Sequence, residues 1–323
     1  MVNFTLLQGG KESSSSRGSS VVVSLEDGIS DTERDIGRVY DAISKAAQLV
    51  SKQLPFRLGM TKQLNPFGEK QAELDVFSNE TFAKALLDTA QVGWVASEEL
   101  EKPLGGFRQT SDSLAIAMDP LDGSSNIATN NPLGSIFGIW RGEIPKKGRE
   151  LAAAAFVTYG PTLTLTLTCN GRVDQYVEVK EGENPARFVR GYTQMKLPES
   201  PEVYSFGAPR SDWIPEIERF VSRLEMRKMH LRFCGTMIGD YNQVLQRGGI
   251  FSYPRHKAKP QGKLRICYET APVSYINELA GGSSSDGEKS ILEILPDSFT
   301  QTSPFYVGNT ELIRELESEL SQA

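Results

Sequence analysis

The decapeptide AMDPLDGSSN, residues 117–126, places two carboxylates three residues apart and follows them directly with Gly-Ser-Ser. Asp119 and Asp122 fall at the end of a hydrophobic strand predicted over LAIAMD, where Pro120 stops the ladder and the chain turns. Carboxylates in this position suit a tight turn, a helix N-terminus or a metal ion. Mg²⁺ in particular prefers carboxylate oxygens combined with phosphate oxygens of a substrate.

The three residues after Asp122 could bind a phosphate. Gly123, Ser124 and Ser125 supply backbone N–H groups at a predicted helix start, where unpaired donors and the helix dipole favour an anion. A metal and a phosphate could therefore meet at this one turn.

Further acidic residues stand next to predicted strand ends or helix starts. They are Glu98 and Glu99 after GWVAS, Glu269 at the end of KLRICYE, and Asp75 with Glu69 before a predicted helix. Adjacent glutamates at a strand end point in different directions, so one could ligate a metal while the other holds a water. Each group alone could be loop acids or turn formers, but the whole set favours metal-assisted phosphoryl transfer to water.

The first half of the chain must supply the elements that position these acids. Apolar residues spaced by three and four predict a helix from Ser30 to Val50, with Ser30 and Glu33 as a capping box, and a second helix covers about 74–90. Successive strands are predicted at GWVAS, LAIAMD, SIFGIW, AAAAFVTYG, TLTLTLT and DQYVEV, of which the alternating TLTLTLT predicts one solvent-facing side.

The second half alternates helices and strands, which favours an α/β layer. The predicted order is helix PEIERFVSRL, strand HLRFC, helix TMIGDYNQVLQRG, strands GIFSY and KLRICYE, helix APVSYINELAGG, strand PFYVG and a helix from Asn309. Residues 181–202 show no period and carry prolines. We therefore predict a disordered tail over 1–29, a metal-binding α+β domain over 30–198, and an α/β sugar-phosphate-binding domain over 199–323.

Composition narrows the class of protein. The net charge of −6, from 35 basic and 41 acidic residues, argues against general nucleic-acid binding, and no apolar run is long enough for a membrane span. Three scattered cysteines indicate reduced thiols, and the Ser-rich start lacks a signal peptide's apolar core. We expect a cytoplasmic protein.

The motifs together resemble one family over nearly everything from residue 30 onward. The pieces ELDVFSNE, VASEE, MDPLDGSSN, GSIFGIW, GGIFSYP, GKLRICYE and AGG resemble those of the class I fructose-1,6-bisphosphatase family, including its sedoheptulose-1,7-bisphosphatase branch. The resemblance implies a layered αβαβα sugar-phosphatase fold of two domains. It also implies a hydrolase that removes the 1-phosphate of a sugar bisphosphate.

The resemblance assigns roles to the acidic residues. Two or more Mg²⁺ ions, which Mn²⁺ could replace, would be held by Glu98, Asp119, the Leu121 carbonyl, Asp122 and Glu269. Asp75 and Glu99 would orient and deprotonate the attacking water, with Glu69 in a nearby loop. Gly123, Ser124 and Ser125 would hold the phosphate to be cleaved.

The resemblance also assigns the distal phosphate, to Tyr253, Lys263 and an Arg232 from a neighbouring subunit, which implies a homodimer or homotetramer. Gly207 and Arg210, in YSFGAPRSDW, replace the Asn and Tyr of fructose-specific members and are similar to the sedoheptulose branch. We therefore expect a preference for sedoheptulose-1,7-bisphosphate, with strict fructose-1,6-bisphosphatase activity as the alternative.

Two regulatory motifs of the family are missing. The segment GISDTERD and the pair Ser113-Leu114 replace the AMP-binding motifs, and FRLGMTKQLN lacks the paired cysteines of redox-controlled members. We expect neither AMP nor thioredoxin control. Two rival functions stay open, an inositol or nucleotide phosphatase of the same superfamily and a non-catalytic sugar-phosphate-binding scaffold.

Overall fold

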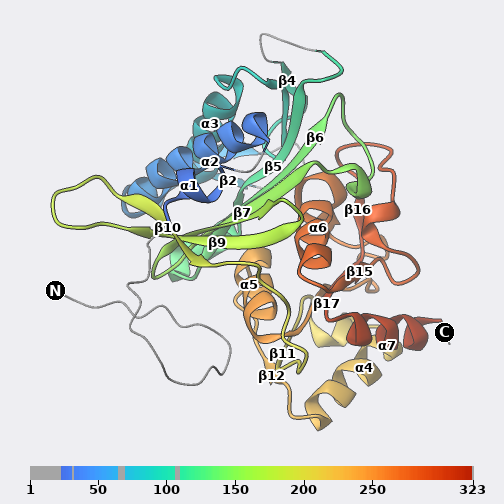
Figure 1. The fold of residues 1–323 in the computed structure, drawn as a ribbon. Coiled ribbons are helices and arrows are strands. Elements are labelled where there is room, and N and C mark those ends of the chain that lie inside the picture. Colours follow the sequence, from blue (N-terminus) through green and yellow to red (C-terminus); the bar gives the residue numbers. More distant parts are fainter. Residues whose placement is uncertain (1–22, 31–32, 65–69, 106–109, 322–323) are drawn as a thin grey trace.

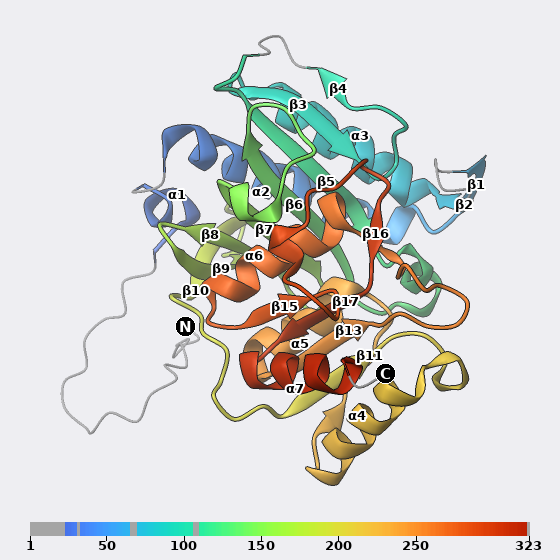
Figure 2. The ribbon, with the colours of Figure 1, turned by 90° about the vertical axis from the view of Figure 1, so that its right-hand side faces the viewer.

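The computed structural model of the chain describes residues 23–30, 33–64, 70–105 and 110–321, and it is built in alternating layers of helices and sheets (Figure 1). Helices α2 (Arg34–Gln53) and α3 (Glu73–Leu87) cover the outer face of a large sheet. Helices α5 (Met237–Arg247) and α6 (Ala271–Leu279) lie between this sheet and a smaller one, as Figure 2 shows from the side. Helices α4 (Pro215–Met226) and α7 (Thr310–Leu320) form the last layer, so the predicted αβαβα fold is confirmed.

Among the described residues, the large sheet has eight strands in the order β10-β9-β8-β7-β6-β5-β3-β4. Their bounds are β3 (Val92–Ser97), β4 (Leu104–Gly105), β5 (Leu114–Asp122), β6 (Leu133–Arg141), β7 (Ala153–Tyr159), β8 (Leu163–Cys169), β9 (Arg172–Val179) and β10 (Arg187–Tyr192). All neighbours run antiparallel except β3 and β5, which are parallel. The carboxyl ends of β3 and β5 therefore meet at the same edge of the sheet.

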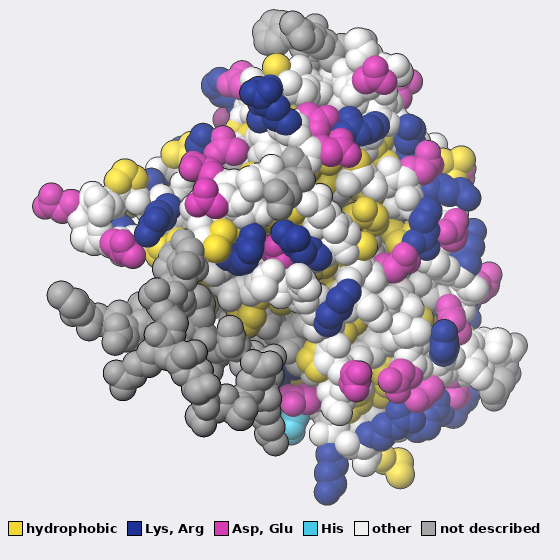
Figure 3. All heavy atoms as spheres, viewed as in Figure 1, with side chains coloured by type: hydrophobic (Ala, Val, Ile, Leu, Met, Phe, Trp, Pro, Cys, Tyr) yellow, Lys and Arg dark blue, Asp and Glu magenta, His cyan; other side chains and the backbone are white. Residues whose placement is uncertain are grey.

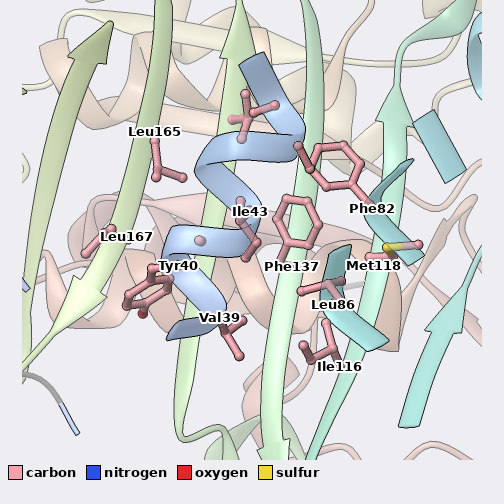
Figure 4. Close-up of a cluster of buried hydrophobic side chains, with 14 of the residues drawn as sticks. Val39, Tyr40, Ile43, Phe82, Leu86, Ile116, Met118, Phe137, Leu165 and Leu167 are labelled. Carbon is pink, nitrogen blue, oxygen red and sulfur yellow. The ribbon is translucent and has the colours of Figure 1, made fainter. Parts of the chain in front are cut away.

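Helix α2 forms because its apolar residues recur every three or four positions and are buried on one face. Figure 4 shows them packed with α3 residues such as Phe82 against Phe137 of β6, whose rings meet edge to face at 4.9 Å. The predicted capping box is wrong, because Glu33 is itself the N-cap residue and forms an ion pair with Arg141.

The prediction of a solvent-facing side for TLTLTLT is also wrong. The Thr166 side chain of β8 is fully buried, because helices cover both faces of the large sheet. Its hydroxyl accepts a hydrogen bond of 2.9 Å from Gln175, which also donates to Asn242 of α5. An alternating polar pattern here marks a buried polar contact between layers.

The smaller sheet has the order β12-β11-β13-β17-β15. Its strands are β11 (Val203–Phe206), β12 (His230–Leu231), β13 (Gly249–Tyr253), β15 (Ser283–Ser285) and β17 (Phe305–Gly308). Strand β11 runs parallel to β12 and β13, whereas β17 runs antiparallel to β13 and β15. One of its faces packs on α5 and α6, and the other packs on α4 and α7.

Short elements complete the description. They are α1 (Leu25–Gly28), β1 (Met60–Leu64), β2 (Lys70–Ala72), β14 (Leu264–Arg265), β16 (Thr302–Ser303), η1 (Leu54–Phe56), η2 (Ser124–Thr129), η3 (Gly148–Glu150), η4 (Arg210–Asp212), η5 (Ile266–Thr270) and η6 (Ile291–Glu293). The predicted strand KLRICYE is wrong after Arg265, where the chain enters the π-helical turn η5. Within the predicted disordered tail, α1 is ordered and Leu25 is buried in the core.

The charged side chains on the surface and the lengths of the helices agree with the expectations drawn from the composition. Lys and Arg side chains are interspersed with Asp and Glu over the face shown in Figure 3. Within the described ranges, no helix combines the length and the apolarity that a bilayer crossing needs. The domain limits 30–198 and 199–323 stay a prediction.

Candidate active site

The parallel pairing of β3 and β5 brings their acidic ends together. Glu98 and Glu99 directly follow Ser97, the last residue of β3. The Glu98 N–H continues the ladder by donating to the Met118 carbonyl at 3.1 Å, one residue before Asp119. The parallel pairing of the two strands therefore places these acids at one edge of the sheet.

A β-bulge places both aspartates of the DPLD stretch at this edge. Asp119 pairs with Ile136 of β6 and Asp122 with Gly134, so one residue of β6 faces two of β5. Bulges re-aim side chains and are frequent beside active sites. In a regular strand without this bulge, side chains three positions apart such as Asp119 and Asp122 would point to opposite faces of the sheet.

The carboxylates of Asp75 and Asp122 each accept backbone N–H groups at the start of a helix. Asp75 lies in the first turn of α3, where its Oδ2 accepts the Ala72 N–H at 2.7 Å. The Asp122 carboxylate accepts the N–H of Met237 at 3.2 Å and of Ile238 at 2.7 Å at the start of α5. Helix N-termini favour negative charge, so both contacts are favourable positions for a carboxylate. The second contact also links the large sheet to the second half of the chain.

Arg265 and Glu269 enter from the segment before α6. The Arg265 N–H donates to Glu269 Oε2 at 2.6 Å, across the turn η5. The Arg265 guanidinium lies 2.6 Å from Glu98 Oε1, and both side chains are buried. Arg265 was not among the predicted site residues; its spacing of four residues from Glu269 was the available signal.

These groups line one cavity of about 230 Å³. The predicted site residues in its wall are Asp75, Glu98, Glu99, Asp119, Leu121, Asp122, Gly123, Ser124, Ser125, Tyr253, Lys263 and Glu269. Gly235, Met237, Leu264 and Arg265, which were not predicted, complete it. The structure thus brings the acidic, phosphate-turn and basic candidates around one space.

The donor set fits a divalent cation. Ligand oxygens of Glu98, Asp119 and Glu269 all lie within 4.8 Å of one another, and the three residues are buried. Burial raises the pKa of Asp119 well above its usual range, and Glu98 and then Asp122 raise it further. Burial also raises the pKa of Asp122 to about 7, against the lowering effect of the Ile238 N–H. Buried carboxylates this close together need positive charge to remain ionised, and a hard cation with oxygen ligands meets that need.

Two contacts orient the remaining cavity residues. Gln71, just before α3, donates its side-chain N–H to Glu99 Oε2. Nothing in the sequence pointed to Gln71, because its partner is 28 positions away. Across the cavity, Lys263 Nζ lies 5.4 Å from the centre of the Tyr253 ring.

Three predicted residues lie outside the cavity wall. Gly207 packs against the Tyr253 ring, and a Cβ there would come within 2.5 Å of it. The Arg210 guanidinium forms ion pairs with Glu218 at 3.3 Å and Glu225 at 3.5 Å. Arg232 donates to the neighbouring Leu231 carbonyl. Glu69 lies outside the described residues.

Family models match both halves of the chain. Residues 20–184 match the model described as the fructose-1,6-bisphosphatase N-terminal domain, and residues 197–321 match that of the C-terminal domain.

Individual relatives agree with the family models. A class 1 fructose-1,6-bisphosphatase of Haloarcula marismortui is 37% identical over 297 residues, covering 92% of this chain and 99% of that protein. One of Halobacterium salinarum is 39% identical over 285 residues, covering 88% and 97%. Holo Leishmania major fructose-1,6-bisphosphatase superposes with a TM-score of 0.85 at 29% identity, covering 94% and 100%. None of these names supports a sedoheptulose branch, and the chain belongs to the class 1 fructose-1,6-bisphosphatase family of phosphoric monoester hydrolases.

Proposed function

We propose that this protein is a Mg²⁺-dependent fructose-1,6-bisphosphatase that hydrolyses the 1-phosphate of its substrate. The observation that carries this proposal is the single cavity in which buried carboxylates face the Gly123–Ser125 turn. The names of its relatives favour the fructose ester over the sedoheptulose ester expected from Gly207 and Arg210.

Glu98, Asp119, Asp122 and Glu269, with the Leu121 carbonyl, would hold Mg²⁺ or Mn²⁺. The bound ions would neutralise phosphate charge and stabilise the leaving sugar oxygen. Both Asp122 oxygens already accept a helix N–H, but a carboxylate oxygen has a second lone pair and can serve both contacts.

Asp75 and Glu99 would take the proton of the attacking water. The water oxygen would form a bond to phosphorus while the bond from phosphorus to the sugar oxygen breaks. One carboxylate would accept the proton of the water, and the leaving sugar oxygen would take up a proton from solvent and depart as a hydroxyl group. Gln71 supports Glu99 in this role, because its hydrogen bond fixes the position of one carboxylate oxygen of the proposed base. Backbone N–H groups of Gly123 and Ser124 would hold the transferred phosphate.

Tyr253 and Lys263 would bind the distal phosphate. Their place in the cavity wall supports this role, and an ammonium group is a suitable partner for a phosphate. Arg232, which lies outside the cavity of its own chain, would contribute from a second copy in a homodimer or homotetramer.

Sedoheptulose-1,7-bisphosphate is a candidate second substrate, because Gly207 and Arg210 are similar to the sedoheptulose branch. Comparison of kcat/KM for the two sugar bisphosphates tests the preference. We expect at least a tenfold higher value for the fructose ester, corresponding to about 1.4 kcal/mol. A higher value for the sedoheptulose ester would restore the original expectation, and turnover of inositol phosphates alone would favour the superfamily rival.

We further propose that neither AMP nor thioredoxin regulates the enzyme. Arg141, beside the start of α2, pairs with Asp35 at 2.9 Å and with Glu33, so this cation is already neutralised. Cys169, Cys234 and Cys267 form no disulfide, which fits a reducing compartment such as the cytoplasm. Severalfold loss of activity in millimolar AMP would contradict the first part.

A further inference from the structure

The peptide group between Pro120 and Leu121 forms the centre of the β-bulge that carries the two aspartates. Its N–H, from Leu121, donates to Asp119 Oδ1 at 3.0 Å. Its carbonyl, from Pro120, accepts a hydrogen bond of 2.8 Å from the Ser135 hydroxyl. One peptide plane is therefore held at both ends, and one of those ends is a carboxylate of the acidic cluster.

The Ser135 side chain is in turn contacted by a residue of the next strand, β7. Its side chain is fully buried on β6, and its Oγ lies 3.1 Å from the hydroxyl of Tyr159 on β7. Because the single Ser135 hydrogen is directed to Pro120, the Tyr159 hydroxyl must be the donor in this contact. Tyr159 reaches Ser135 diagonally, since the direct partner of Ser135 across the strands is Val157.

The β-bulge explains why the Pro120 carbonyl needs a side-chain hydrogen-bond donor. Ser135 is the residue of β6 that faces both Pro120 and Leu121, so the regular ladder cannot pair every backbone group on β5. A buried carbonyl without a hydrogen-bond partner would destabilise the folded state. The Ser135 hydroxyl replaces the missing ladder bond, and the successive bonds from Tyr159 to Asp119 polarise one another.

We propose that Ser135 and Tyr159 are positioning residues of the active site. Through the peptide between Pro120 and Leu121 they fix the direction of the Asp119 carboxylate and of the bulge backbone. Neither residue lies in the cavity wall, so each acts through the bulge and not by contact with substrate. The inference rests on the proposed metal site and deepens it.

Metal binding by the purified protein tests this role without turnover. Mn²⁺ affinity is measured by electron paramagnetic resonance, in which the free ion gives the signal, and urea unfolding is followed in parallel. Ser135→Ala should weaken Mn²⁺ binding about tenfold, as expected for a residue that orients a metal ligand. Ser135→Thr, which keeps the hydroxyl, should restore most of the affinity, and Tyr159→Phe should cause a smaller loss.

Ser284→Ala is the matched control, because Ser284 is also a buried serine on a strand but lies in β15, outside the cavity wall. It should leave Mn²⁺ affinity unchanged. Unchanged affinity in folded Ser135→Ala protein would overturn the proposal; if that variant does not fold, unchanged affinity in Tyr159→Phe would do so. A wild-type protein that fails to bind Mn²⁺ would instead reject the proposed metal site, and this inference with it.

Discussion

The buried contact between Arg265 and Glu98 offers a quantitative test of the charge balance in the site. The two groups lie 2.6 Å apart, and each side chain is 9% exposed. Arg265 Nη1 also lies 3.9 Å from Glu269 Oε2. Without a metal, this guanidinium supplies positive charge directly to two of the three clustered carboxylates.

Replacement by methionine, Arg265→Met, removes the charge and keeps an unbranched apolar stem. Two unit charges about 4 Å apart attract by about 4 kcal/mol at an effective dielectric constant of 20. Breaking a buried pair by removing one partner costs about 3–5 kcal/mol. We therefore expect the free energy of unfolding in EDTA to fall by about 3–5 kcal/mol.

Saturating Mg²⁺ should restore part of this loss, because the cation then takes over the neutralising role. We expect Mg²⁺ to stabilise the variant more than the wild type by at least about 1.4 kcal/mol, equivalent to tenfold tighter binding. Urea unfolding in EDTA and in Mg²⁺ measures both quantities. Arg247→Met is the control, since the exposed pair of Arg247 with Glu202 should contribute about 0–1 kcal/mol. If Arg265→Met lowers the free energy of unfolding equally in EDTA and in Mg²⁺, then Mg²⁺ does not take over the neutralising role of Arg265.

Three further predictions concern the base, a buried acid and the subunit contact. Glu99→Gln should lower kcat by orders of magnitude while leaving Mn²⁺ affinity and unfolding largely unchanged; unchanged turnover would remove Glu99 from the mechanism. Burial raises the pKa of Asp240 to about 6, so the folded state binds its proton more tightly than the unfolded state and stability falls as pH rises from about 4 through 6. Relative to wild type, Asp240→Asn should therefore gain about 2 kcal/mol in urea unfolding between about pH 4.5 and pH 8, and a pH-independent difference would contradict this. Arg232→Ala should raise KM with little change in kcat, and a monomer in light scattering would rule out its action across subunits.

The acids of the site could be predicted from sequence because they follow strand ends that stand next to each other. The positions of Glu98 and Asp119 could be predicted because each lies at the end of a clearly bounded hydrophobic strand. In the structure, these two strands pair in parallel and bring the two acids together. Asp122 needed the bulge as well, which Pro120 signalled only in part.

Other features depended on contacts that no local pattern encodes. The burial of Thr166 follows from the second helical layer, which packs from the far half of the chain. The turn η5 has the composition of a strand, and its conformation is coupled to the Arg265 N–H bond with Glu269. Gln71 and Ser135 act through partners on other elements, so their roles required the three-dimensional structure.

The most direct test of the account is phosphate release from fructose-1,6-bisphosphate by the purified protein, measured with Mg²⁺ and with EDTA. We expect one phosphate released per sugar in Mg²⁺, fructose 6-phosphate as the other product, and no release in EDTA. Release that persists in EDTA, or loss of the 6-phosphate in place of the 1-phosphate, would contradict this expectation, and no release under either condition would favour a non-catalytic relative.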